Sequence, residues 1–363
     1  MSIDDLRSRI DAIDDGILDL LERRAEVARE IAEHKRALGL PAHDPERERR
    51  LFARLEQAAA ARPNALFPKA GVRPVFREIV SACLSRAEPT SVAYMGPPGT
   101  FSHIAARAAF GLGARYVETV TIGAVVEAVA RGAVAYGVAP IENSTEGGVS
   151  ATLDALADAD VMIGSELVIA VPLCLIGRHD DLSRVQRVHS HPQPLAQSRL
   201  WLAQHLPQAE LVTSTSTAAA AREAAADDAS AALGSRLLAE LYDLIVIRDN
   251  VQDRPENATR FIVLGKNDAA PTGRDKTSLV FSTPHVRGAL RRVLEIFDGE
   301  GLNLTRIESR PALGKRWEYV FFTDVEGHRH DEPVARALER LRHDCSHVKV
   351  LGSYPRGDST LSA

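Results

Sequence analysis

The first 40 residues carry an apolar seam that restricts them to one long helix. Apolar side chains recur at alternating spacings of four and three residues, and Arg24 stands in the same register. The apolar members are Leu6, Ile10, Ile13, Ile17, Leu20, Val27 and Ile31. This periodicity predicts a packed helix from about Asp4 to Leu38, about 50 Å long. Because nothing else in residues 1–88 is large enough to cover such a helix, we expect a partner chain to pack against it.

The remainder of residues 1–88 has no β signals and is also predicted to be helical. Gly39 ends the long helix, and Asp44 and Pro45 are a suitable N-cap and first turn for a second helix. A third apolar helix, "VFREIVSACLSRA", closes the segment. We therefore expect residues 1–88 to form an all-α domain.

Composition narrows the class of protein. Apolar residues make up 45% of the 363 residues and charged residues 26%, as in ordinary globular proteins. The net charge of −5 gives no electrostatic reason to expect nucleic acid or a membrane as partner. No apolar run approaches a membrane span, the N-terminus does not resemble a signal peptide, and three scattered cysteines predict neither disulfides nor a metal site. We expect a cytoplasmic location.

After residue 90 the sequence pattern changes to short apolar strands that alternate with helical stretches. This pattern predicts an α/β domain over residues 91–266, with mostly parallel strands and an Ala-rich helix near residues 218–232. Its polar, Gly-rich stretches follow strands, at the edge where such sheets bind ligands. After a linker, residues 278–355 follow a β-α-β-β-α-β order typical of a small α+β module.

Two basic residues on the buried face of the long helix indicate an anionic ligand. Lys35 follows Arg24 by eleven residues, about three turns, so both face the same way. One such residue alone is explained if its aliphatic chain packs on the apolar face while its charged group reaches water. Two cations on the buried face, however, need an anion. Arg7 precedes Arg24 by seventeen residues and points about 100° away. Arg7 can therefore join the same site only from another subunit.

Residues 1–88 resemble the all-helical chorismate mutase domain over nearly their whole length. The likeness rests on "LRSRID", "ERRAEVA", "HK" and "DPERERR". In that family two subunits interlock, and each active site takes one arginine from the partner. The resemblance implies that Arg24 and the partner subunit's Arg7 clamp the two carboxylates of chorismate, and that Lys35 reaches a carboxylate and the ether oxygen.

Asp44, Arg47 and Glu48 by themselves are typical of a solvated surface, but the resemblance implies that they form and support the site for the ring hydroxyl. A pericyclic rearrangement needs only a folded substrate and positive charge near the breaking C–O bond. One departure matters: Cys83 and Ala87 stand where the family usually carries Ser and Gln or Glu. Either Glu88 substitutes for the missing side chain or the mutase is weakened.

Five polar blocks of the central segment occur in the same order as in prephenate dehydratases, which this segment resembles. They are "GPPGTFSH" (96–103), "PIENSTEGGV" (140–149), "SHPQPLAQS" (190–198), "STSTAAA" (214–220) and "NATRF" (257–261). Each block alone is explained by turn or cap chemistry, but five in order are a specific signal. The resemblance implies two α/β lobes, like those of periplasmic binding proteins, with a cleft between them.

The reaction explains the residue types. Prephenate, a dianion, loses its ring hydroxyl and its ring carboxylate, as CO2, in one aromatising step that needs no cofactor and no metal. Hydroxyls and backbone N–H groups at helix starts can hold carboxylates. The expected substrate-binding hydroxyl and amide residues are Thr100, Ser102, Ser144, Gln193, Ser214 and Thr215, and further catalytic positions are Asn143, Ser190 and Gln197.

For the leaving hydroxyl we expect Thr259 to be the hydrogen-bond donor, with Arg260 supplying charge nearby. Glu142 is harder to place, because a carboxylate beside a dianion is repulsive. We expect it to orient neighbouring groups without touching the substrate carboxylates.

The C-terminal segment resembles the amino-acid-binding ACT domain, through "GALRRVL" (288–294) and "IESRPALGKRWEYVFF" (307–322). Arg287 replaces the usual Pro before the first block. Taken alone, "ESRP" is explained as a turn at a strand end, and the module as one that serves only for dimerisation. With the central segment, we expect phenylalanine to bind between paired modules and to inhibit by feedback. The expected binding residues are Gly288, Ala289, Leu290, Glu308, Ser309, Arg310 and Pro311.

The sequence thus predicts a bifunctional chorismate mutase and prephenate dehydratase of phenylalanine synthesis, a homodimer or dimer of dimers. Alternatives are a prephenate or arogenate dehydratase with a degenerate mutase domain, and a non-catalytic ligand sensor. A fused dehydrogenase is not expected, because "GLGARY" (111–116) lacks the third glycine of a dinucleotide-binding loop and does not open a helix after a strand.

Overall fold

A computed structural model describes residues 2–39, 44–62, 65–87, 90–267, 269–311, 319–357 and 360–361. The chain divides into two compact units. The first comprises Met1–Ser91 with Phe110–Arg115, and the second comprises Val92–Ala109 with Tyr116–Ala363. None of the helices in the described ranges combines the length and the apolar character that a membrane crossing requires.

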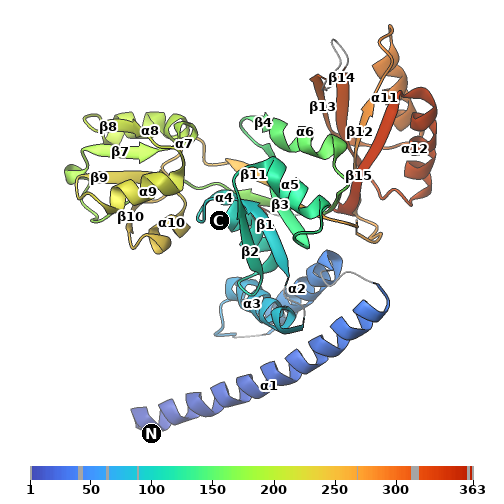
Figure 1. Cartoon of the computed structure of the whole chain (residues 1–363). Coiled ribbons are helices and arrows are strands. Elements are labelled where there is room, and N and C mark those ends of the chain that lie inside the picture. The colour runs from blue at the N-terminus through green and yellow to red at the C-terminus, as the bar shows by residue number, and fades with distance from the viewer. Residues whose placement is uncertain are drawn as a thin grey trace. The chain divides into compact units, whose positions relative to one another are not determined.

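The first unit is helical, as the sequence predicts. Its helices are α1 (Ile3–Ala37), α2 (Pro45–Ala60) and α3 (Lys69–Ala87) (Figure 1). Asp44 is the N-cap of α2, with Pro45 in the first turn. Glu56 of α2 and Arg73 of α3 join the two shorter helices through a 2.6 Å ion pair.

The apolar seam of α1 is exposed in the single chain. Its seven apolar residues retain between 45 and 62% of their surface, and Ala32 is the helix's buried residue. An isolated helix with this much exposed apolar surface is unfavourable in water, so the seam needs a covering surface.

The second unit begins with a mixed sheet in the order β16-β5-β11-β3-β1-β2, with β4 paired to β3. Its elements are β1 (Ser91–Met95), α4 (Phe101–Phe110), β2 (Arg115–Thr119), α5 (Ile122–Ala130), β3 (Tyr136–Asn143), β4 (Gly147–Gly148), α6 (Ser150–Asp158), β5 (Met162–Ala170), β11 (Ala258–Gly265) and β16 (Thr360–Leu361). The prediction of a mostly parallel sheet is wrong here. The chain leaves this lobe after β5 and returns as β11, which lies antiparallel between β5 and β3.

The second lobe is a five-stranded sheet in the order β10-β6-β9-β7-β8. Its elements are β6 (Cys174–Gly177), the 3-10 helix η1 (Leu182–Arg184), β7 (Arg187–Ser190), α7 (Pro192–Gln197), α8 (Arg199–His205), β8 (Glu210–Thr213), α9 (Thr217–Ala225), β9 (Ser230–Gly234), α10 (Arg236–Leu241) and β10 (Ile245–Arg248). The predicted Ala-rich helix is too long. It ends at Ala225, and residues 230–234 form a fully buried central strand.

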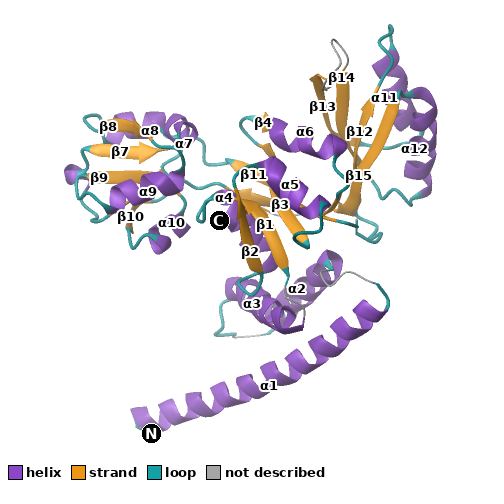
Figure 2. Ribbon diagram, viewed as in Figure 1, coloured by secondary structure: helices purple, strands orange, loops and turns teal. Residues whose placement is uncertain are grey.

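The third sheet confirms the predicted β-α-β-β-α-β order (Figure 2). Its elements are β12 (Asp275–Ser282), α11 (Ala289–Gly299), β13 (Leu304–Pro311), β14 (Tyr319–Glu326), α12 (Glu332–Asp344) and β15 (His347–Pro355), in the antiparallel order β13-β14-β12-β15. One face packs on α11 and α12. The other face contributes Phe322 and Tyr354 to the core that also holds Leu153 and Ile163 of the first lobe.

The third sheet approaches the first lobe closely at Gly352. A Cβ built on Gly352 would lie 2.3 Å from the carbonyl oxygen of Ile163 on β5. The φ of Gly352, +151°, is also unfavourable for other residues. This glycine therefore permits the packing of β15 on β5.

We predict that Gly352→Ala lowers the Tm by about 5 °C or more, because the added methyl group forces the two sheets apart. Gly123→Ala is the control, because a Cβ there meets its nearest neighbour at 3.9 Å, within α5. Thermal unfolding followed by circular dichroism measures both. Equal Tm values for the two variants would contradict this account of Gly352.

Candidate functional site

A cleft of about 900 Å³ is lined by residues of both α/β lobes. Its lining comes from the loop after β1, the turn between β3 and β4, α7, the start of α9, and β11. These are the places where the polar blocks of the sequence lie. Of the predicted dehydratase residues, those that line it are Thr100, Ser102, Asn143, Gln193, Gln197, Thr215 and Thr259.

Asn143 and Thr259 form the polar centre of this cleft. They are directly paired in the antiparallel register of β3 and β11. Asn143 Nδ2 donates to Thr259 Oγ1 at 2.9 Å, and the two residues are 8% and 9% exposed. Because the threonine oxygen accepts this bond, its own proton is left for a molecule in the cleft.

The side chain of Asn143 is held in one orientation. Its Oδ1 accepts the backbone N–H groups of Thr145 at 2.9 Å and Glu146 at 3.2 Å, and the Thr145 hydroxyl at 2.6 Å. With three donors on the oxygen, the amide nitrogen must point toward Thr259. The turn "NSTE" therefore orients the side-chain amide of Asn143.

Further amides connect this centre to the second lobe. Asn143 Nδ2 also donates to Asn257 Oδ1 at 3.0 Å, and Asn257 Nδ2 donates to Gln197 Oε1 at 3.3 Å. Gln193 and Gln197 both donate to Glu146 Oε1, at 2.6 and 3.3 Å. Sequence reasoning missed Asn257 and Glu146, although both stand inside quoted motifs.

The charge of the cleft is mixed. The described residues that line it include the carboxylates of Glu118 and Glu146, the guanidinium of Arg222 on α9, and His191, the N-cap of α7. Arg222 and His191 were also missed. Arg222 lies beyond the quoted "STSTAAA" block, whereas His191 lies inside its own block but was not singled out.

Three predicted hydroxyl residues have other roles. Ser190 is fully buried, and its Oγ donates to the carbonyl of Leu233 at 2.8 Å. Ser214 Oγ donates to Glu223 at 2.5 Å. Ser144 Oγ accepts the N–H of Ala258 at 3.0 Å. None of the three is among the described residues that line the cleft.

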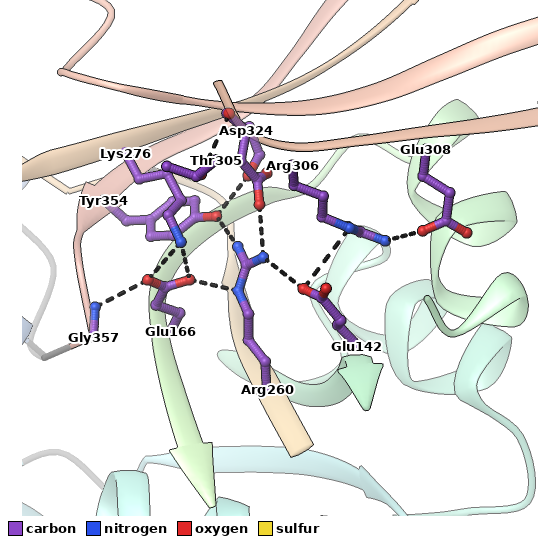
Figure 3. Close-up of polar contacts among 11 residues, drawn as sticks. Glu142, Glu166, Arg260, Lys276, Thr305, Arg306, Glu308, Asp324, Tyr354 and Gly357 are labelled. Atoms are coloured by element: carbon purple, nitrogen blue, oxygen red, sulfur yellow. Dashed lines mark hydrogen bonds and ion pairs between the residues drawn. The ribbon is translucent and has the colours of Figure 1, made fainter. Parts of the chain in front are cut away.

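Glu142 and Arg260 lie on the other face of the strand pair (Figure 3). The sequence predicts charge from Arg260 in the cleft, but its guanidinium binds Glu166 and Asp324 at 2.6 Å each. Glu142 Oε2 lies 3.3 Å from the same guanidinium and 3.8 Å from Arg306. The reason is that successive side chains of a strand alternate between faces, so Asn143 and Thr259 in the cleft put their neighbours behind it.

In the helical unit, the predicted mutase residues stand on α1 and at the start of α2. Arg7 is exposed, with Asp4 at 3.2 Å, while Arg24 and Lys35 are half-buried. Seventeen residues of one helix separate Arg7 from Arg24 by about 25 Å. This distance prevents both from binding the same small molecule within one chain.

The remaining predicted mutase residues belong to the second and third helices. Asp44 Oδ1 caps α2 by accepting the N–H of Arg47 at 2.9 Å, and Glu48 is half-buried. Cys83 is buried on α3, whose final residue is Ala87. Glu88 lies outside the described residues.

The third sheet has its own pocket, of about 250 Å³. It is lined by the predicted Gly288, Ala289 and Leu290, with Tyr319 and Phe321 of β14. Gly288 has a φ of +77° and is the N-cap of α11.

The predicted "ESRP" motif is divided between the two faces of β13. Ser309 and Pro311 pair with Phe321 and Tyr319, which border the pocket. Glu308 ion-pairs with Arg306 on the opposite face, and Arg310 binds Asp154 of α6 at 2.7 Å. Residues 312–318 of the quoted block lie outside the described residues.

Three family models match the chain in order. They are chorismate mutase type II over residues 6–88, prephenate dehydratase over residues 92–269, and the ACT domain over residues 277–343. A "Bifunctional chorismate mutase/prephenate dehydratase" from Aquifex aeolicus is 43% identical over 352 residues, which cover 97% of each chain.

Solved structures resemble the second unit. A prephenate dehydratase from Arthrobacter aurescens, in complex with L-Phe, is 37% identical with a TM-score of 0.69, over 74% of this chain and 91% of that one. A structure described as GqqA, a novel type of quorum quenching acylases, is 32% identical with a TM-score of 0.67, over 74% of this chain and 98% of that one.

The helical unit, the two lobes that form the cleft and the β-α-β-β-α-β module therefore correspond, in this order, to the three matched domains. The chain belongs to the family of bifunctional chorismate mutase/prephenate dehydratases with a C-terminal ACT domain.

Proposed function

We propose that this chain converts chorismate to prephenate in residues 1–88 and prephenate to phenylpyruvate in residues 91–266. Residues 278–355 would bind phenylalanine, the amino acid made from that product, and inhibit the second step. The observation that carries the proposal is the Asn143–Thr259 pair, fixed in a cleft by its own backbone. We place the enzyme in the cytoplasm, where free thiols such as Cys83 and Cys174 are usual.

In the dehydratase step, the ring carboxylate leaves as CO2 and its C–C bond electrons enter the ring. The ring hydroxyl departs with its bond electrons and takes up one proton to leave as water. Thr259 donates a hydrogen bond to that oxygen as charge develops on it. Since a threonine hydroxyl is a weak acid, it acts by position or by relaying a proton.

The remaining polar groups of the cleft suit a dianion. Arg222 supplies positive charge for a carboxylate, and Gln193 and Gln197 supply amide donors. Both amides bond to Glu146, which holds them in place. Glu146 also repels the substrate carboxylates, and this repulsion would favour loss of the ring carboxylate as CO2.

The fold alone does not fix this reaction, because a structure described as a quorum quenching acylase shares it. The full-length matches to bifunctional enzymes favour the dehydratase, and so does a cleft centred on a threonine and an asparagine. Direct assay of the reaction decides between them.

For the mutase step we propose a homodimer in which the α1 seams of two chains pack together. The exposed apolar residues of α1 supply the surface, and the separation of Arg7 from Arg24 requires the second chain. Each site then combines Arg24 and Lys35 of one chain with the partner subunit's Arg7, and Asp44, Arg47 and Glu48 line the end that takes the ring hydroxyl. Because Cys83 and Ala87 offer no charge or amide at the ether oxygen, Lys35 takes that role among the described residues.

Thr259→Ala should reduce prephenate turnover by about a hundredfold or more, because one positioned donor to the leaving oxygen is lost. Thr259→Ser, which keeps the hydroxyl, should retain most of the activity. Phenylpyruvate absorbance measures both variants, and an unchanged Tm shows that the fold is intact. Near-normal turnover of Thr259→Ala would refute the role of Thr259.

Mixed dimers test the shared mutase site. Arg7→Ala and Arg24→Ala should each abolish chorismate turnover. When the two variants are co-expressed, half of the random dimers carry one intact site, so about a quarter of wild-type activity should return. The rate of chorismate loss measures this recovery. If the two arginines act within one chain, the mixture stays inactive.

A further inference from the structure

A buried cluster of charges lies behind the cleft, between the first lobe and the third sheet (Figure 3). At its centre is Arg260, whose side chain is 11% exposed. Its guanidinium binds Glu166 of β5 and Asp324 of β14 at 2.6 Å, and Tyr354 of β15 at 3.0 Å. One side chain of the dehydratase lobe is thus bonded to two strands of the third sheet.

Each carboxylate in this cluster has a second partner. Lys276 Nζ lies 3.0 Å from Glu166, and Ser278 Oγ donates to Asp324 at 2.5 Å. The side chains of Glu166 and Asp324 are both 3% exposed. Burial alone would raise the pKa of the Asp324 carboxyl, but Arg260 and Ser278 outweigh it and lower that pKa. Both buried carboxylates thus have at least two polar partners, which makes the geometry of the cluster costly to change.

The cluster is continuous with the two central residues of the cleft through the strands themselves. Arg260 follows Thr259 on β11, and Glu142 precedes Asn143 on β3. In the strand register, Thr259 stands opposite Asn143 and Arg260 stands opposite Glu142. A displacement of Arg260 or Glu142 along its strand displaces the residue beside it. The ion pairs on the face away from the cleft thus set the spacing of Asn143 and Thr259 on the face that lines the cleft.

The same alternation occurs in the third sheet. Ser309 and Pro311 of β13 pair with Phe321 and Tyr319 of β14, which line the small pocket. Arg306 and Glu308 point to the other face of β13. Arg306 contacts Glu142 at 3.8 Å and ion-pairs with Glu308. Glu308 occupies the place where any side chain at Gly148, a residue of the cleft lining, would lie. Two strand pairs therefore stand back to back, each with a pocket on its outer face.

We infer that Glu142, Arg260 and Arg306 are positioning residues, which hold Asn143 and Thr259 in register and carry the state of the third sheet's pocket to the dehydratase cleft. This inference rests on the proposed function and names the route of its regulation. A ligand that shifts β13 against β14 moves Arg306, and thereby Glu142 and the strand end that bears Asn143. The shift acts on the rate of the chemical step, because the groups that hold the substrate carboxylates, Arg222, Gln193 and Gln197, lie on α9 and α7 and not on the strand pair.

The test uses Glu142→Gln and Arg306→Lys in the full-length chain. Glu142 is 39% exposed, so its substitution leaves the buried carboxylates paired with Arg260. Arg306→Lys keeps the charge but loses the planar group that reaches two carboxylates at once. If one variant is too unstable to assay, the other carries the test.

The control is Lys349→Met. Lys349 Nζ also joins the third sheet to the first lobe, through the carbonyls of Leu156, Ala157 and Ala159 at 2.6–3.0 Å. These hydrogen bonds go to the end of α6, away from the paired residues of β3 and β11 that face the cleft. This variant should lower the Tm and leave both kcat and inhibition as in wild type.

The readouts are kcat and KM for prephenate, the ratio of rates without and with saturating phenylalanine, and phenylalanine binding by calorimetry. Both test variants should lower kcat about tenfold or more, with KM within about twofold of wild type. The inhibition ratio should fall by about two- to thirtyfold, while phenylalanine still binds.

Wild-type kcat and inhibition in both test variants would overturn the inference, and so would an equal loss of inhibition in Lys349→Met. Loss of phenylalanine binding in the test variants would also overturn it, since the residues would then serve the ligand and not its transmission. A wild-type chain that neither consumes prephenate nor responds to phenylalanine would instead contradict the proposed function.

Discussion

The antiparallel pairing of β3 with β11 is the constraint on which the rest of the second unit depends. It places Asn143 opposite Thr259, and because strand side chains alternate, it also places Glu142 opposite Arg260 on the other face. A shift by one residue would exchange the two faces, leaving charge in the cleft and a hydroxyl behind it. The register is fixed from both sides, by the amide bonds in front and the ion pairs behind.

The buried ion pairs serve geometry more than stability. Removing one partner from such a cluster costs about 3–5 kcal/mol, yet replacing the whole cluster by apolar residues is often neutral. Apolar contacts between Phe322, Tyr354 and the first lobe already hold the sheets together. The charges fix the orientation of the third sheet relative to the first lobe, because the guanidinium of Arg260 can bind Glu166, Asp324 and Tyr354 together in only one arrangement.

The sequence predicted much of the candidate site because the chemistry is concentrated in short motifs. Thr259, Asn143, Gln193 and Gln197 were identified in this way, and all four line the cleft. Arg260 was misplaced because it was grouped with its neighbour Thr259 in "NATRF", although adjacent residues of strand β11 point to opposite faces. Ser190 was misplaced for another reason: its hydroxyl satisfies a buried carbonyl of β9, a strand that the sequence analysis had assigned to a helix.

The sequence by itself determined the three folds and their order, since hydrophobic period and turn chemistry are local properties that any stretch of chain displays. It also determined that Arg7 and Arg24 cannot meet within one chain, because helix geometry depends only on their spacing. Only the tertiary structure decided which motif residues reach the cleft, and that the "ESRP" strand faces both a pocket and the dehydratase lobe. Those facts depend on strand register and on which sheet covers which face, and both are set by contacts between residues more than a hundred positions apart.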